Sequence, residues 1–359
     1  MALFFDLLDQ SKQCNRASQN SLDQLPFHAP NNKYKITYHA LIIPNLPAPL
    51  HYFNFYSLLG QPNALALQNE SSINTSPLDT ATVFNSVSGK MAGCLHSYSI
   101  EKDCSFLQNQ FQFSDCESIR GEFPNFQIER EDAELSLKIK ITATNTVSHF
   151  IKLRMTLAEH WSLLCRCEGE ITYKQQKIEI NHLGTFDFAR TINFPYIPFA
   201  FYSYQIVNLK NDRQLICMQI RNEINEILQS RIYLRDGLKQ ATQMFDEHVE
   251  FNIYRIYPQI TTPNGHQMYL PREFEWKYIN RDGTQIILTA QSRGDFKFGL
   301  GAGYVGSFNY SVNINNDEEI GEGGYCEYID CRALKWQEQN KEDENYKYIA
   351  DSVPFLTKR

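Results

Sequence analysis

The chain has 359 residues, of which 42% are hydrophobic, 13% aromatic and 21% charged, a balance typical of a globular protein with room for two domains. Its 34 basic and 41 acidic residues give a net charge of −7, with no basic block to neutralise phosphates. We therefore expect no nucleic-acid partner, and the composition also argues against disorder and a membrane span.

The N-terminus and the cysteines both favour a reducing compartment. The opening Met-Ala-Leu-Phe-Phe is followed by Asp6 and Asp9, and it lacks the basic start and small-residue cleavage site of a secretory signal. The nine cysteines are scattered from Cys14 to Cys331 and are odd in number, which is not the pattern of a disulfide framework. We expect a cytoplasmic protein.

Period-2 alternation of apolar and polar residues recurs along the chain, whereas helical periodicity is scarce. The clearest case is 134–144, where Leu135, Leu137, Ile139 and Ile141 alternate with polar residues as in a half-buried strand. The class predicted is all-β, and the abundant aromatic residues suit pleated surfaces. Further strands are predicted at 167–173, 177–181, 202–209, 215–220, 232–234, 249–257, 285–290 and 308–314, with turns at 211–212, 263–265 and 282–283.

Two short segments resemble each other. Gly184-Thr185-Phe186-Asp187-Phe188 and Gly324-Tyr325-Cys326-Glu327-Tyr328 each follow a plausible hairpin, and each begins with a small residue and ends with an acid followed by an aromatic residue. A match this short fits either two related domains or a coincidence. Paired prolines in 194–198 interrupt a strand ladder and mark a linker. The predicted division is an N-terminal extension (1–31), a first barrel (32–193), the linker (194–198), a second barrel (199–334) and a polar tail (335–359).

Two patches also resemble a known group of proteins. The ending from Tyr310-Ser311-Val312 through Glu322-Gly323-Gly324-Tyr325-Cys326-Glu327-Tyr328 resembles the closing hairpin of lipocalin-like proteins related to carotenoid 1,2-hydratase and AttH. The segment 38–49 resembles the start of an uncharacterised bacterial family with the same ending. The resemblance implies two tandem lipocalin-like (calycin) antiparallel β-barrels packed side by side. It also implies a cavity for an apolar ligand and, in some members, cofactor-free addition, isomerisation or cyclisation of a polyene or terpenoid-like substrate.

This sequence departs from those relatives at the end of the first domain. Some of them carry an asparagine and a tryptophan-rich His-Asp motif there, whereas this chain reads His182-Leu183-Gly184-Thr185-Phe186-Asp187. The resemblance therefore supports the fold more than any specific reaction.

Two segments look like cofactor-binding motifs, but neither has the surrounding sequence that such a site requires. Gly301-Ala302-Gly303-Tyr304-Val305-Gly306 has the three glycines of a dinucleotide loop, but the sequence after it alternates like a strand and not like the helix that would hold a pyrophosphate. Cys165 and Cys167, with His160 upstream, lack a second pair of zinc ligands, so buried cysteines are the simpler interpretation. We expect no cofactor and no metal.

The acids of the two similar segments are the candidate catalytic residues. On a strand, Tyr325 and Glu327 project to one face and Cys326 and Tyr328 to the other, and Asp187 occupies the matching place in the first segment. If these faces point inward, an apolar environment raises the pKa of Glu327 into the range of a general acid, with Tyr325 assisting. If they point outward, the acids pair with Arg190 or Arg332 where the domains meet.

Each of the remaining candidate ligand contacts has a second interpretation as a packing residue. His39 and His51 flank an apolar, proline-rich segment that is placed to cap a barrel mouth, and each is otherwise a hydrogen-bonded packing residue. Trp276 and Tyr304, with Asp187, complete the predicted ligand-binding set; the alternative for Trp276 is a place in the core.

Three functions remain open. The first is binding of an apolar small molecule, a lipid or a terpenoid-like compound, in the cavity of a barrel of about eight strands. The second is a cofactor-free hydratase or isomerase that protonates an unsaturated apolar substrate through Glu327. The third is an interaction scaffold whose barrels are filled by their own side chains, with no protein partner indicated.

Overall fold

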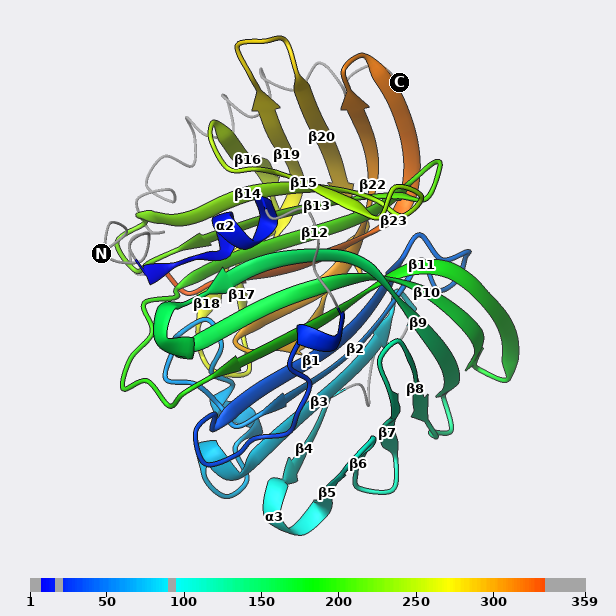
Figure 1. The fold of residues 1–359 in the computed structure, drawn as a ribbon, viewed down its shortest axis with the longest axis vertical. Helices are drawn as coiled ribbons and strands as arrows, with labels where there is room; N and C mark the ends of the chain where they lie inside the picture. Colours follow the sequence, from blue (N-terminus) through cyan, green and yellow to red (C-terminus); the bar gives the residue numbers. More distant parts are fainter. Residues whose placement is uncertain (1–7, 17–21, 90–94, 333–359) are drawn as a thin grey trace.

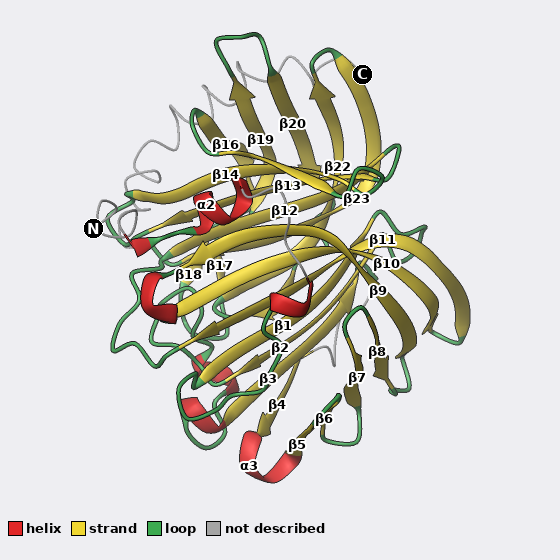
Figure 2. Ribbon diagram, in the orientation of Figure 1, coloured by secondary structure: helices red, strands yellow, loops and turns green. Residues whose placement is uncertain are grey.

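The computed structural model describes residues 8–16, 22–89 and 95–332, and most of these form two curved antiparallel sheets packed side by side (Figures 1 and 2). The predicted all-β fold of two barrels in tandem is confirmed. Within the described residues the first sheet has 11 strands in a near-closed barrel, and the second has 10 strands in a half-barrel, where about eight each were expected.

The first sheet has the strand order β4-β3-β2-β1-β11-β10-β9-β8-β7-β6-β5. Its strands are β1 (Ile36–Pro44), β2 (Tyr52–Leu59), β3 (Thr80–Val87), β4 (Leu95–Ser99), β5 (Cys104–Leu107), β6 (Gln110–Phe113), β7 (Glu117–Glu122), β8 (Asn125–Arg130), β9 (Leu135–Lys152), β10 (Ala158–Tyr173) and β11 (Gln176–Thr191).

The second sheet has the order β15-β14-β13-β12-β23-β22-β20-β19-β16, with β21 paired to β22. Its strands are β12 (Phe201–Leu209), β13 (Arg213–Arg221), β14 (Ile227–Asp236), β15 (Ala241–Phe245), β16 (Val249–Ile256), β19 (Pro271–Ile279), β20 (Gln285–Ser292), β21 (Lys297–Leu300), β22 (Gly303–Ile314) and β23 (Asp317–Asp330). The short strands β17 (Ile260–Thr261) and β18 (Gln267–Met268) pair apart, and the helical turns are α2 (Ser11–Arg16), η1 (Leu22–Gln24), η2 (Glu70–Ser72), η3 (Pro77–Asp79), α3 (Ile100–Asp103) and η4 (Arg154–Thr156).

The two sheets share a topology. In each, the first strand pairs with the last, β1 with β11 and β12 with β23, and the last strand closes a long hairpin, β10–β11 or β22–β23. The strands of the first sheet come from 36–191 and those of the second from 201–330, so the predicted linker falls between β11 and β12. The predicted tail, 335–359, lies outside the described residues.

The glycine of each similar segment is a site of close packing. A Cβ on Gly184 would lie 2.6 Å from Sγ of Cys167, and one on Gly324 would lie 2.5 Å from Cε2 of Phe308. These distances are far below van der Waals contact, so only glycine fits beside the neighbouring strand. Both segments therefore combine a tight strand contact with an acid three residues later.

Strands β1 to β3 were absent from the alternation pattern for a physical reason. All eight residues of β3 are buried, because Val83 packs in the core of the first barrel while Phe84 packs in the cluster shared with the second sheet. A strand buried on both faces shows no period-2 signal.

The glycine-rich run leads into a strand. Gly301 lies in the turn between β21 and β22, and a Cβ on Gly303 would lie 2.5 Å from the carbonyl oxygen of Tyr328. Cys165 and Cys167 are buried in the core of the first barrel. In the part of the chain that the structure describes, no group of three histidine, cysteine or acidic side chains is arranged to hold a metal ion, and no helix is long and apolar enough to cross a membrane.

Candidate active site between the two barrels

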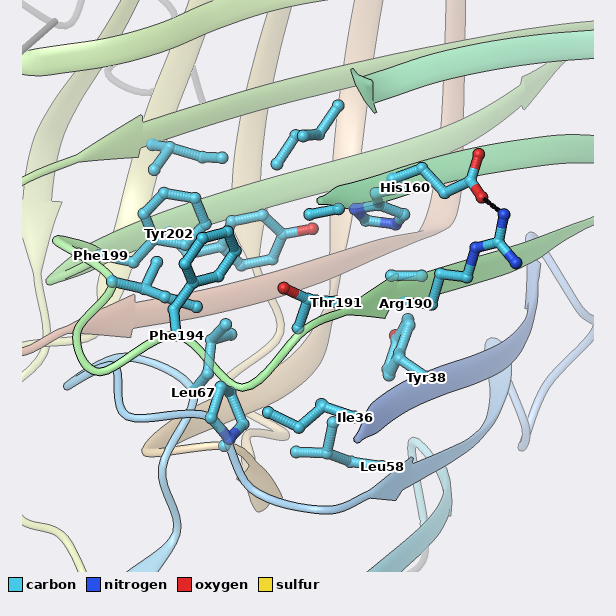
Figure 3. Close-up of a pocket in the computed structure, with 18 of the residues that line it drawn as sticks. Ile36, Tyr38, Leu58, Leu67, His160, Arg190, Thr191, Phe194, Phe199 and Tyr202 are labelled. Atoms are coloured by element: carbon cyan, nitrogen blue, oxygen red, sulfur yellow. Dashed lines mark ion pairs between the residues drawn. The ribbon is translucent and has the colours of Figure 1, made fainter. Parts of the chain in front are cut away.

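A cavity of about 410 Å³ lies where the two sheets and the segment between them meet. Figure 3 shows Tyr38 from β1, His160 from β10 and Arg190 from β11 in one part of its wall, and Phe199 and Tyr202 from the start of the second half in another. Most of the wall is apolar, so the cavity suits a molecule that is itself largely apolar. It lies between the sheets and not inside either one.

The alternation of β11 sets where Asp187 points. Phe186 and Phe188 belong to the core of the first barrel, so the residue between them faces outward, toward the second sheet. There the hydroxyl of Tyr204, on β12, donates a hydrogen bond of 3.1 Å to Oδ2 of Asp187.

The alternation of β23 likewise sets where Glu327 points, in this case from the second sheet toward the first. The sulfur of Cys326 accepts a hydrogen bond from the buried amide of Gln205, whereas Tyr325 faces the first sheet with its ring 5.4 Å from that of Tyr52. The hydroxyl of Tyr325 donates to Oε1 of Glu327 at 2.9 Å, and Glu327 forms part of the cavity wall. Each sheet therefore turns its acid outward, toward the other sheet.

Neither acid takes an arginine partner of the kind considered from the sequence. Arg190 pairs with Glu159, and Arg332 pairs with Asp330 at 2.8 Å. The carboxyl of Glu327 instead accepts hydrogen bonds from the hydroxyls of Tyr325 and Tyr202. The acids thus point outward, as in the second alternative drawn from the sequence, but tyrosines and not those arginines are their hydrogen-bond partners.

Burial makes Glu327 a weak acid. Its pKa is raised to about 8, first by burial and then by the negative charge of Asp187, against the lowering effect of hydrogen bonds from Tyr325 and Tyr202. Burial also raises the pKa of Asp187 to about 6, although Ser162, Arg235 and Tyr204 stabilise its anion. Near pH 7, Glu327 therefore keeps its proton while Asp187 is mostly ionised.

The tyrosines around the pair stay neutral. Burial raises the pKa values of Tyr38, Tyr202 and Tyr325 well above the usual value for tyrosine, and the charge of Glu327 raises them further. Their hydroxyls therefore remain hydrogen-bond donors at every physiological pH, and those of Tyr202 and Tyr325 hold the carboxyl of Glu327 in one orientation.

Two of the predicted ligand contacts lie in the cores. His39 is inside the first barrel, with its ring 5.2 Å from Phe111 and 5.3 Å from Phe188, and burial lowers its pKa to about 3. Trp276 is inside the second sheet, where Nε1 donates to Oε1 of Gln205 at 2.7 Å. Neither side chain is part of the cavity wall described above.

The other predicted contacts are not part of the cavity wall either. His51 is in the loop after β1 with a φ of 55°, where its carbonyl oxygen would be 2.4 Å from a Cβ on Gly323. Tyr304, on β22, packs with its ring 5.4 Å from Phe298. Asp187 influences the site because its negative charge raises the pKa of Glu327.

Sequence reasoning missed several residues of the wall. Tyr38, His160 and Tyr202 face the cavity, and Phe194 and Phe199 in and after the predicted linker cover one side (Figure 3). No sequence signal separates these from other aromatic residues, because their exposure to a common space depends on how the two sheets pack.

Comparison with known proteins bears on the fold and the family. A model of a protein family matches residues 56–344, most of the chain. The chain belongs to the family of unknown function DUF6670. No curated protein sequence matches it.

Solved structures resemble this DUF6670 chain at low identity. An AttH candidate from Nitrosomonas europaea is 15% identical with a TM-score of 0.63, covering 88% of this chain and 98% of that one. Kievitone hydratase from Nectria haematococca is 13% identical with a TM-score of 0.54, covering 82% and 89%. CghA in complex with Sch210972 is 7% identical with a TM-score of 0.51, covering 88% and 98%. These matches establish an AttH-like, lipocalin-type fold.

Proposed function

We propose that this protein binds an apolar small molecule, a lipid or a terpenoid-like compound, in the cavity between its two barrels. The observation that carries the proposal is the apolar space of about 410 Å³ with Glu327 in its wall. That volume lies above the lower end of roughly 300 Å³ for small-molecule sites. A scaffold with fully packed barrels provides no reason for such a space, so binding is favoured over an interaction scaffold.

The proposal is tested by native mass spectrometry of the purified protein, followed by extraction and identification of any bound compound. We expect an apolar compound in a one-to-one complex. A protein that is empty, and that also binds no added apolar fluorophore, would contradict the proposal.

A second function, catalysis on the bound molecule, is favoured by the protonation state of Glu327. An acid with a pKa of about 8 in an apolar wall is well matched to give up a proton near neutral pH. The name of kievitone hydratase, which has this fold, fits addition of water as one such reaction. We infer a cofactor-free hydratase or isomerase acting on an unsaturated apolar substrate.

The inferred reaction begins with proton transfer from Glu327 to one carbon of a carbon–carbon double bond. The π electrons form the new C–H bond, which leaves a cation on the neighbouring carbon and a carboxylate on Glu327. Water then adds to the cation and loses a proton to the carboxylate, or the cation loses a neighbouring proton and the double bond moves. The faces of Tyr202 and Phe199 stabilise the cation, and Tyr325 and Tyr202 stabilise the carboxylate through hydrogen bonds.

Catalysis is tested with the extracted compound in deuterated water. We expect the wild-type protein to introduce deuterium into the compound, and we expect Glu327→Gln to bind equally well but to exchange about 10²-fold more slowly, the scale of a lost general acid. Equal exchange rates in the two proteins would remove Glu327 from the mechanism and leave binding alone.

A further inference from the structure

His160 is an unusual component of the cavity wall. It lies on β10 opposite Ala189, and its ring packs edge-on against Phe150 at 4.8 Å and against Tyr38 at 6.1 Å. Burial lowers its pKa to about 3, so its imidazole is neutral in the folded protein. Among the described residues neither ring nitrogen has a hydrogen-bond partner, and Nε2 is buried.

An imidazole without a partner needs an explanation. Buried polar groups are nearly always hydrogen-bonded, and leaving one unpaired is costly. His160 nevertheless forms part of the wall of a space large enough for a small molecule, and Nδ1, which unlike Nε2 is not fully enclosed, is the ring nitrogen that a partner in this space would contact.

The polar groups of the wall are also unevenly placed. His160, Arg190 and Thr191 come from the facing ends of β10 and β11, while Leu67, Phe194 and Phe199 form an apolar side (Figure 3). The terminal nitrogens of Arg190 are already engaged, because they pair with Glu159 and contact Nε2 of His28 at 2.7 Å, whereas its Nε is buried without a partner among the described residues. Arg190 therefore offers a new partner only a buried N–H donor, whereas the neutral imidazole of His160 offers both a donor and an acceptor.

We propose that the ligand carries a hydroxyl group and that this hydroxyl hydrogen-bonds to the imidazole of His160, while its hydrocarbon part lies against Phe194 and Phe199. The inference rests on the proposed binding function and specifies the ligand as an alcohol or a phenol. A neutral imidazole has one donor and one acceptor nitrogen, and a hydroxyl complements either, whereas an ether or a ketone can only accept. A neutral ring also provides no charge to attract a carboxylate.

The test uses two probes of closely similar shape, 2-naphthol and 2-methylnaphthalene, which differ in a hydroxyl against a methyl group. Their dissociation constants are measured for the wild type and for His160→Phe, which keeps an aromatic ring but has no nitrogen. We expect His160→Phe to weaken 2-naphthol about tenfold or more, because the hydroxyl would lose its partner in an apolar wall, and to change 2-methylnaphthalene less than twofold.

Two further variants keep the result interpretable. His160→Asn retains a donor and an acceptor, and we expect it to preserve most of the affinity for 2-naphthol. Phe199→Leu removes apolar contact only, and we expect it to weaken both probes to the same degree. Circular dichroism checks that each variant is folded.

The outcomes separate the two proposals. If the wild type binds both probes and His160→Phe weakens both equally, the hydroxyl contact is refuted while binding in the cavity stands. If the wild type carries no compound after purification and binds neither probe, the proposed function fails and this inference fails with it.

Discussion

Replacing Glu327 by glutamine should make stability less dependent on pH. Glutamine is neutral at all pH values and resembles the protonated acid that the folded protein favours. In the wild type the pKa is raised from 4.5 in the unfolded chain to about 8 in the folded protein. Between these values the folded protein keeps a proton that the unfolded chain has lost, so the free energy of unfolding falls as pH rises through this window.

The size of the effect follows from the shift. Each pKa unit corresponds to about 1.4 kcal/mol, so the penalty in the wild type is about 0.8 kcal/mol at pH 5 and about 3.4 kcal/mol at pH 7. The stability of Glu327→Gln relative to the wild type should therefore increase by about 2.5 kcal/mol between these two values. Glu327 is 2% exposed, so solvent screening reduces this figure little.

The assay is urea unfolding at pH 5 and pH 7, followed by tryptophan fluorescence and by circular dichroism. Glu322→Gln on the same strand is the matched control, because Glu322 is exposed and its change should affect stability nearly equally at both pH values. If the difference between Glu327→Gln and the wild type is the same at pH 5 and pH 7, Glu327 ionises normally and the electrostatic argument for a protonated acid is refuted.

Three further predictions concern the surroundings of the site and the first barrel. Asp187→Asn should lower the pKa of Glu327, because it removes the charge that opposes ionisation; NMR titration of the Glu327 carboxyl would contradict this by showing no shift. Arg130→Met should destabilise the protein by about 3–5 kcal/mol in urea unfolding, because it leaves the buried carboxyl of Glu117 without its arginine; a loss under 1 kcal/mol would show that the carboxyl finds other partners. Gly184→Ala should cost about 1–3 kcal/mol, since its methyl group would lie 2.6 Å from a buried sulfur, and a thermal melt equal to that of the wild type would mean that the strands adjust freely.

The alternation of apolar and polar residues predicted strands from residue 134 onward and missed those that come before it. Alternation identified β9 because its two faces differ, with Leu135 and Ile139 inside the barrel and Lys138 and Lys140 exposed. It did not identify β3, which is buried on both faces. The long hairpins were predicted too short, because 177–181 covers only part of β11 and the alternation is lost at 184–188, where five successive residues are buried.

The candidate site was predictable only in part. The two similar segments singled out Asp187 and Glu327 correctly as residues with equivalent positions, since period 2 fixes which neighbours share a face. Whether that face meets the lumen or the other sheet depends on the packing of two sheets distant in sequence. The same limit applies to His160, whose place beside Tyr38 and the cavity is set by the contact between β1, β10 and the second sheet.

The central claim is that the space between the barrels holds an apolar molecule, and blocking that space tests it most directly. Ala189 lines the cavity on β11, so Ala189→Trp should obstruct it, whereas Ala241→Trp places the same side chain at an exposed position on the edge strand β15. Native mass spectrometry of the three proteins, each shown to be folded, should detect a bound apolar compound in the wild type and in Ala241→Trp but not in Ala189→Trp. Retention of the compound by Ala189→Trp, or its absence from all three together with no binding of 2-naphthol or 2-methylnaphthalene to the wild type, would contradict the account.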